Sequence, residues 1–149
     1  MSTSLYNRTT ISGNGNPSAP NPRKYRGFST VNKNSKNFAL YDFELIKQDL
    51  LNSFYVRQGE KLMDPEYGCV IWDLLFEPLT AQVKDLLLQN INAIVNADPR
   101  VQASNVVITQ YETGLQLEMT LTYVAYNLSE NLRIHFDQKV GLLATSLKQ

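Results

Sequence analysis

The sequence predicts an α+β fold: two main helices packed on a small antiparallel β-meander, preceded by an extended N-terminal arm. Before residue 98, apolar side chains recur at spacings of three and four, the period of a helix with one buried face. After that point they alternate with polar side chains, which is typical of a half-buried strand. The first 37 residues follow neither period and are rich in Asn, Ser, Thr, Gly and Pro, which indicates an extended segment.

The composition is that of one globular domain. With 149 residues, 43% of them hydrophobic, the chain is long enough to bury a sizeable core. No apolar run approaches the ~18 residues of a membrane helix, and the N-terminus lacks the apolar region of a secretory signal. Cys69 is the single cysteine, which excludes an intrachain disulfide and fits a reducing cytoplasm. The predicted organisation is an arm (1–39), a folded domain (40–138) and a C-terminal tail (139–149).

The net charge of zero hides a division between the arm and the body. Residues 1–41 carry six basic and no acidic side chains, which gives +6, and the remaining residues carry −6. This separation predicts electrostatic docking to a partner or a neighbouring subunit, with a solvated tail as the alternative. Because the body is acidic, nucleic acid is not an expected partner. The candidate contact residues of the arm are Arg23, Lys24, Arg26, Lys33 and Lys36.

Two helices are expected before residue 98. The first begins with Asp42 as its N-cap and ends at about Phe54. Its apolar face consists of Phe43, Ile46, Leu50 and Phe54. The second helix follows Thr80 as its N-cap and ends at Asp98-Pro99. Its predicted buried stripe consists of Val83, Leu86, Leu87, Ile91 and Ile94.

The segment between the two helices is irregular. Gly and Pro interrupt an alternating pattern over Val56–Val70, which we interpret as a short hairpin with an irregular loop. Trp72–Phe76 is expected to form one helical turn that stops before Pro78. We expect four apolar side chains to hold this segment against the helices, namely Tyr67, Trp72, Leu75 and Phe76.

Three strands are expected after residue 98. Ser104–Tyr111 and Leu115–Ala125 are joined by a hairpin turn at Glu112–Gly114. Asn127–Asn131 forms a second turn, and Leu132–Phe136 is the third strand. In the second of these strands, every other residue from Leu115 to Ala125 is apolar and lies on one face, and the polar side chains between them lie on the other. Three strands packed on a helix leave at least one open sheet edge.

An enzymatic site would have to be built from carboxylates. Five of them lie close together in the irregular segment: Glu60, Asp64, Glu66, Asp73 and Glu77. A glycosidase needs two carboxyl groups about 5–9.5 Å apart, one of them with a raised pKa. Acidic residues are also common in turns and at helix starts, and this structural interpretation is the one we favour.

The other candidates for chemistry are single residues. A His135–Cys69 nucleophile pair is conceivable, but a lone Cys between Gly68 and Val70 is more typical of a small buried hydrophobic residue. No second histidine or cysteine is present to complete a metal site, and no phosphate-binding glycine motif occurs. No cofactor is therefore expected.

The corner Asp98-Pro99-Arg100 has two interpretations. It is a helix stop followed by a surface arginine, which contributes little energy. Alternatively, it is a rigid corner that presents the guanidinium fork of Arg100 to a partner carboxylate.

One continuous stretch carries a family resemblance. DPEYGCVIWDLLFEPLT, an amphipathic helix, the D-P-R corner and a β-meander follow in that order, and together they resemble the baseplate wedge protein of contractile phage tails. This family is also called the sheath initiator, and relatives occur in type VI secretion. The resemblance extends from roughly Leu40 to Gln138.

The resemblance implies a structural, non-enzymatic protein of the virion tail baseplate, assembled in the host cytoplasm in several copies around the tail axis. Its implied partners are other wedge proteins and the tail sheath, with tail tube or hub proteins as further candidates and no membrane. The family has a Glu-Pro-Arg corner associated with wedge anchoring, and here Asp98 replaces the glutamate while Pro99 and Arg100 match. Some members have carried a lysozyme label, so a carboxylate-dependent peptidoglycan hydrolase is the alternative.

The implied role also makes expectations for the sheet and the arm. A sheath subunit would add a strand to an open antiparallel edge, and either Leu132–Phe136 or Ser104–Tyr111 is the candidate. The arm, with Arg23 to Lys36 as its contact region, is expected to be disordered in isolation and to become ordered on assembly.

Overall fold

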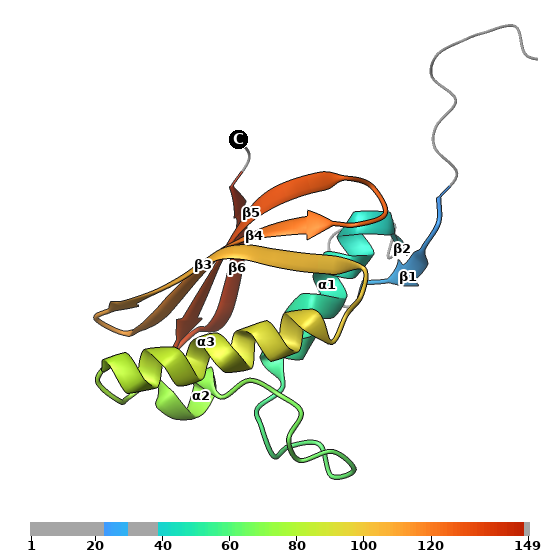
Figure 1. Cartoon of the computed structure of the whole chain (residues 1–149). Helices are drawn as coiled ribbons and strands as arrows, with labels where there is room; N and C mark the ends of the chain where they lie inside the picture. Colours follow the sequence, from blue (N-terminus) through green and yellow to red (C-terminus); the bar gives the residue numbers. More distant parts are fainter. Residues whose placement is uncertain (1–22, 30–38, 148–149) are drawn as a thin grey trace, which may run out of the picture.

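The computed structural model describes residues 23–29 and 39–147, and it confirms the α+β class (Figure 1). In chain order the elements are β1 (Arg26–Phe28), β2 (Ala39–Tyr41), α1 (Asp42–Tyr55), α2 (Ile71–Leu74), α3 (Ala81–Asn96), β3 (Val101–Tyr111), β4 (Gly114–Tyr123), β5 (Leu128–Asp137) and β6 (Gly141–Leu147). Strands β3 to β6 form one antiparallel sheet in sequence order, and β1 and β2 form a separate antiparallel pair. Among the described helices, none is long and apolar enough to cross a bilayer.

The core lies between the inner face of the sheet and the helices, with α3 lying along the sheet in Figure 1. The predicted alternation of β4 is confirmed, because Leu115, Leu117, Met119, Leu121 and Tyr123 are all buried. Side chains of α1 and α3 complete the core from the other side, and Phe54 and Trp72 both meet the ring of Phe136 edge-on. The polar residues between the buried positions of β4 lie on the opposite face.

The two predicted helices are present, with corrections to their ends and faces. Thr80 caps α3 as predicted, because its Oγ1 accepts the Val83 N–H at 3.3 Å. Leu86 was wrongly placed in the buried stripe, since it is exposed and Val95 is buried in its place. Asp42 does not cap α1 through its side chain; the N-cap position is Tyr41, and Asp42 itself has a positive φ of 52°.

The segment that follows α1 is not a hairpin, so that prediction was wrong. Its ends meet in one parallel bridge between Arg57 and Cys69, and consecutive turns fill the space between them. The single helical turn was correct and is α2. Trp72 is pinned as expected, because its Nε1 donates to the Phe54 carbonyl at 2.8 Å, whereas Phe76 is 77% exposed.

The sheet has one strand more than predicted. Residues 139–149, assigned to a C-terminal tail, include β6, which pairs with β5 from Asp137↔Gly141 to Asn131↔Leu147. The turn between β4 and β5 lies at residues 124–127, earlier than expected. Strand β3 begins at Val101 and carries a register shift between Ser104 and Val107, beside Asn105 with a φ of 51°.

Candidate partner-binding site

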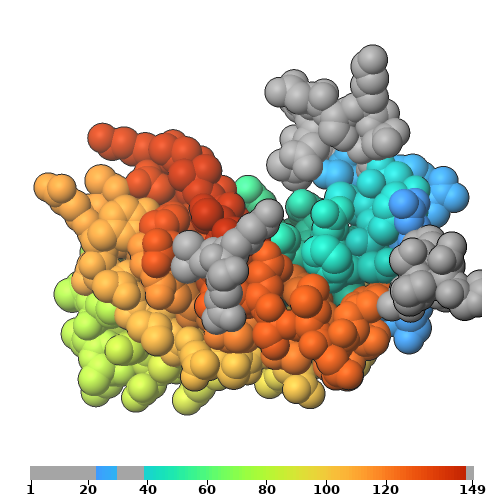
Figure 2. Space-filling model, turned by 90° about the horizontal axis from the view of Figure 1, so that it is seen from above, coloured from blue at the N-terminus to red at the C-terminus, as the bar shows by residue number. Residues whose placement is uncertain are grey.

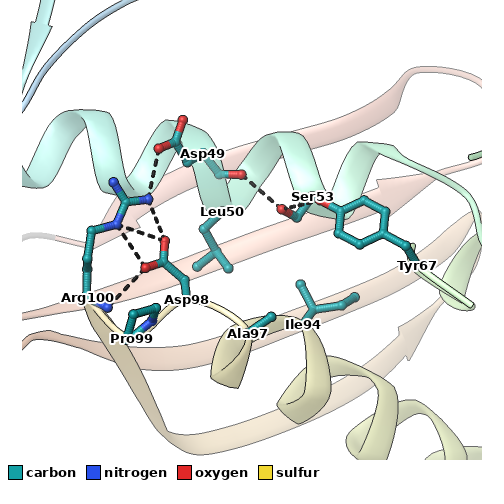
Figure 3. A pocket seen from close by; sticks show the side chains of 9 residues that line it. All are labelled: Asp49, Leu50, Ser53, Tyr67, Ile94, Ala97, Asp98, Pro99 and Arg100. Atoms are coloured by element: carbon teal, nitrogen blue, oxygen red, sulfur yellow. Dashed lines mark hydrogen bonds and ion pairs between the residues drawn. The ribbon is translucent and has the colours of Figure 1, made fainter. Parts of the chain in front are cut away.

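The Asp98-Pro99-Arg100 corner joins the end of α3 to the start of β3, and Arg100 folds back on Asp98 (Figure 3). The Arg100 Nε donates to Asp98 Oδ1 at 2.9 Å, and Nη2 donates to Oδ2 at 2.6 Å. The Arg100 backbone N–H also donates to Asp98 Oδ1, at 3.0 Å. Pro99 holds the two residues in this tight bidentate arrangement, because its ring fixes φ.

A second carboxylate reaches the same guanidinium from α1. Asp49 Oδ2 accepts a hydrogen bond from Arg100 Nη2 at 2.9 Å. The hydrogen bonds from Arg100 hold the pKa of Asp98 below its ordinary value of 3.8. Both carboxylates raise the pKa of Arg100 above its ordinary value, with the hydrogen bond to Asp98 as the largest cause. Two carboxylates and one guanidinium leave this cluster with a net charge of −1.

The guanidinium of Arg100, which we expected to bind a partner carboxylate, is therefore already bound by Asp98 and Asp49. In this structure a partner carboxylate would have to displace Asp98 to take the fork formed by Nε and Nη2 of Arg100. Sequence reasoning missed Asp49, since its position on the polar side of a helix carries no signal of a contact 51 residues away.

A cavity of about 430 Å³ opens beside the cluster, between α1 and the end of α3. Its lining combines apolar side chains with charged and hydroxyl groups, a combination that suits an inserted side chain of a partner. Ser53 Oγ lines this cavity and accepts a hydrogen bond from the Tyr67 hydroxyl at 2.9 Å. The full lining is Asp49, Leu50, Ser53, Tyr67, Ile94, Ala97, Asp98, Pro99 and Arg100.

The described part of the arm lies against the same cluster. The ring of Tyr25 is 5.6 Å from the Arg100 guanidinium, and Arg23 stacks over Tyr41 at 3.8 Å. In Figure 2 the described part of the arm, in blue, lies beside the teal residues of α1, at the opposite end of the molecule from the yellow-green residues. The structure therefore brings together two groups of predicted contact residues, the corner and Arg23, Lys24 and Arg26, while Lys33 and Lys36 lie outside the described residues.

Asp42 holds the arm in this place. Its Oδ1 accepts backbone N–H groups of Lys24 at 2.7 Å and Tyr25 at 3.0 Å, and the Tyr126 hydroxyl at 2.8 Å. The Asp42 N–H donates to the Tyr25 carbonyl at 3.1 Å. These hydrogen bonds, with that from Tyr25 first, lower the pKa of Asp42. Residues 23–29 therefore have defined contacts with the folded domain, and ordering of the arm on assembly stays a prediction.

The candidates for enzymatic chemistry do not form a cluster in the described structure, although Glu66 lines a small cavity of about 120 Å³ next to Gly68 and Asn90. Glu60, Asp64 and Glu66 are all exposed, on the loop that follows α1. Cys69 is buried in the core, and burial raises the pKa of its thiol to about 12, which disfavours a nucleophilic thiolate. His135 instead meets the ring of Tyr111 edge-on at 5.8 Å.

The sheet has two open edges among the described residues, β3 and β6. Ser104–Tyr111 lies in β3, so the prediction that this strand is at an open edge of the sheet is confirmed. Leu132–Phe136 lies in β5, which pairs with β4 and β6, so that candidate was wrong. The reason is that β6, which sequence reasoning missed, covers it.

Comparisons with known proteins agree on one family. The family model described as baseplate wedge protein gp25 matches residues 43–129. The chain is 34% identical over 82 residues to the baseplate wedge protein gp25 of Enterobacteria phage T4. That alignment covers 53% of this chain and 62% of the phage protein, so the match spans less than two thirds of that relative's length.

Among solved structures, the chain is similar to a protein of Geobacter sulfurreducens described as a candidate tail lysozyme. The TM-score is 0.48 with 19% sequence identity, covering 70% of this chain and 93% of the other. A similarity of this size does not establish a shared activity.

Proposed function

This chain belongs to the baseplate wedge protein gp25 family, a structural family of the virion tail baseplate, and we propose that it binds wedge core proteins and templates the first sheath ring by accepting a β-strand. The observation that carries the proposal is the open edge of the four-stranded sheet. An added strand would gain its affinity from main-chain hydrogen bonds, so no special side-chain motif is required.

Of the two open edges, β6 is better suited to receive a strand. It pairs with β5 in an unbroken register, and Gly141–Leu147 contains no charged residue and no proline. Strand β3 carries the irregularity between Ser104 and Val107, and such bulges protect an edge against pairing. Over Gly141–Leu147, the part of this edge that the structure describes, none of these three features is present.

Two side chains of helix α1 hold β6 in position through hydrogen bonds. The Tyr55 hydroxyl donates to the Leu142 carbonyl at 3.1 Å, and Lys47 Nζ donates to Ser146 Oγ at 2.8 Å. Lys47 also pairs with Glu130 of β5 at 3.0 Å. A template strand braced in this way loses little conformational freedom when a partner strand is added.

The Asp98-Pro99-Arg100 corner is our candidate for the wedge contact. Its cavity lies beside the described arm, so Arg23, Lys24 and Arg26 would extend the same contact surface. Asp98 and Asp49 already bind Arg100, so this cluster, with a net charge of −1, would accept a basic group of a wedge protein, whereas the arm cations beside it would accept acidic groups. This replaces the partner carboxylate that the sequence alone suggested.

Paired proline variants test strand addition at β6. Neighbouring residues of an antiparallel edge strand alternate, one N–H facing the adjacent strand and the next facing outward. One of Leu143→Pro and Ala144→Pro should therefore disrupt the sheet, while the other removes only an outward donor and keeps the melting temperature close to that of the wild type.

We expect the stable proline variant to enter baseplates and to fail in sheath assembly, measured as sheathed tails by electron microscopy. Thr109→Pro and Gln110→Pro are the matched pair on β3, and the stable member of that pair should assemble sheath normally. Normal sheath on the stable β6 variant would contradict the assignment of β6, and loss of sheath on the stable β3 variant would move the docking edge to β3.

A further inference from the structure

The loop between α1 and α2 carries two large apolar side chains at its tip, fully in water. Leu62 is 95% exposed and Met63 is 94% exposed, more than any other large hydrophobic residue in the described part of the chain. They are the two central residues of a turn closed by the Asp64 N–H and the Lys61 carbonyl at 3.1 Å. Polar residues, Gly and Pro are the usual occupants of such positions, so the fold does not require Leu or Met there.

This tip stands on a firmly held base. The Cys69 N–H donates to the Val56 carbonyl at 2.8 Å, and Asn90 of α3 binds both the Gly68 carbonyl and the Val70 N–H. Figure 1 shows the loop, in green, extending away from α1 and α3. The two apolar side chains are therefore presented at a defined place on the molecule.

Contacts within the loop fix its shape between the base and the tip. Gln58 Nε2 donates to the Glu66 carbonyl at 3.2 Å, and the Lys61 ammonium lies 4.3 Å from the centre of the Tyr67 ring. The Tyr67 hydroxyl is in turn bound to Ser53 of α1. A rigid loop loses little entropy on binding, which is what an efficient docking element needs.

We propose that Leu62 and Met63 form a docking knob that inserts into an apolar socket with a basic rim on another protein of the baseplate. This inference rests on the baseplate role proposed above. The basic rim follows from charge, since Glu60, Asp64 and Glu66 outnumber Arg57 and Lys61 on the loop. The same acidic excess disfavours docking on a membrane with anionic headgroups.

Replacing the two residues of the knob should affect assembly without affecting folding. Leu62→Ser with Met63→Ser should leave the melting temperature unchanged, because neither side chain is packed within the described structure. Burial of one Leu or Met changes an association constant by about tenfold to a hundredfold, so incorporation of the double variant into tails should fall at least about tenfold. Leu86→Ser is the control, because Leu86 is a half-exposed apolar residue of α3 that belongs to neither proposed contact surface, and it should not change incorporation.

Photocrosslinking identifies what covers the knob. A photoreactive amino acid at position 63 should, in assembled tails, crosslink to apolar residues flanked by Lys or Arg on another baseplate protein. A crosslink to a second copy of this chain, a crosslink to lipid, or no crosslink at all would overturn the proposal. So would normal incorporation of the double variant. Absence of the wild-type chain from purified tails would instead contradict the baseplate role, so the two failures are distinguishable.

Discussion

Replacing Arg100 with alanine tests the role of the corner in folding and in assembly separately. Arg100 joins three parts of the molecule, since it binds Asp98 at the end of α3, binds Asp49 of α1 and lies near Tyr25 of the arm. The substitution removes every one of these contacts at once. It leaves two carboxylates close together without the cation that holds them.

The expected loss of stability is moderate. A hydrogen bond to a charged group contributes about 1.5–3 kcal/mol when buried, but exposed ion pairs contribute only about 0.2–1 kcal/mol. The side chains of Arg100 and Asp98 are 27% and 18% exposed, which lies between these limits. We expect a loss of about 1–2 kcal/mol, or a melting temperature lower by about 2–8 °C for a domain of this size.

Thermal and urea unfolding measure this loss, with Arg133→Ala as the matched control. Arg133 makes one ion pair with Glu118, and both side chains are more exposed, so its replacement should cost under about 1 kcal/mol. The pKa of Asp98 is lowered in the folded state, so its pairing stabilises the protein above pH 3.8 and is lost as pH falls further. The difference between wild type and Arg100→Ala should therefore shrink below that pH.

Two results would contradict a moderate contribution of Arg100 to stability. A melting temperature equal to that of the wild type would mean that the corner contributes nothing to the fold, and an unfolded variant would mean that it contributes far more than its exposure allows. If the folded variant binds wedge proteins as well as the wild type does, the proposed anchoring role of Arg100 is wrong.

Gly68→Ala should lower the free energy of unfolding by at least about 2 kcal/mol in a urea titration, because φ at Gly68 is 122° and an added Cβ would lie 2.6 Å from the Arg57 backbone. Gly59→Ala is the control, because Gly59 has a positive φ but no atoms nearby, and it should cost about half as much in the same titration. Lys47→Met should cost about 1–3 kcal/mol by thermal unfolding, because it leaves the half-buried Glu130 carboxylate without its cation; an unchanged melting temperature would argue against the brace under β6. Cys69 should resist iodoacetamide at pH 8 in the folded protein and react after unfolding, since burial raises its pKa to about 12, and rapid labelling of the native chain would contradict this.

Features set by local patterns could be predicted from the sequence. The alternation of β4 and the Thr80 cap of α3 depend on residues within a few positions of each other, and both were correct. Strand β6 was missed because Gly141–Leu147 has no clear alternation and follows an exposed turn. Its place is set by pairing with β5, which no local period reveals.

The parts of the site that were missed depend on contacts between distant residues. Asp49 reaches Arg100, and Asp42 reaches Lys24 and Tyr25, only after the chain has folded. The spacing of Asp98, Pro99 and Arg100 showed a rigid corner, but it did not show that the guanidinium would be shared between two carboxylates. The sign of the charge presented to a partner therefore came from the structure.

We propose that this chain nucleates the sheath by strand addition at β6. Electron cryomicroscopy of assembled tails tests it most directly. We expect the chain to lie beneath the first sheath ring, with an extended sheath segment hydrogen-bonded along Gly141–Leu147 as a fifth strand of the sheet. A first sheath ring that makes no main-chain pairing with this sheet would contradict it.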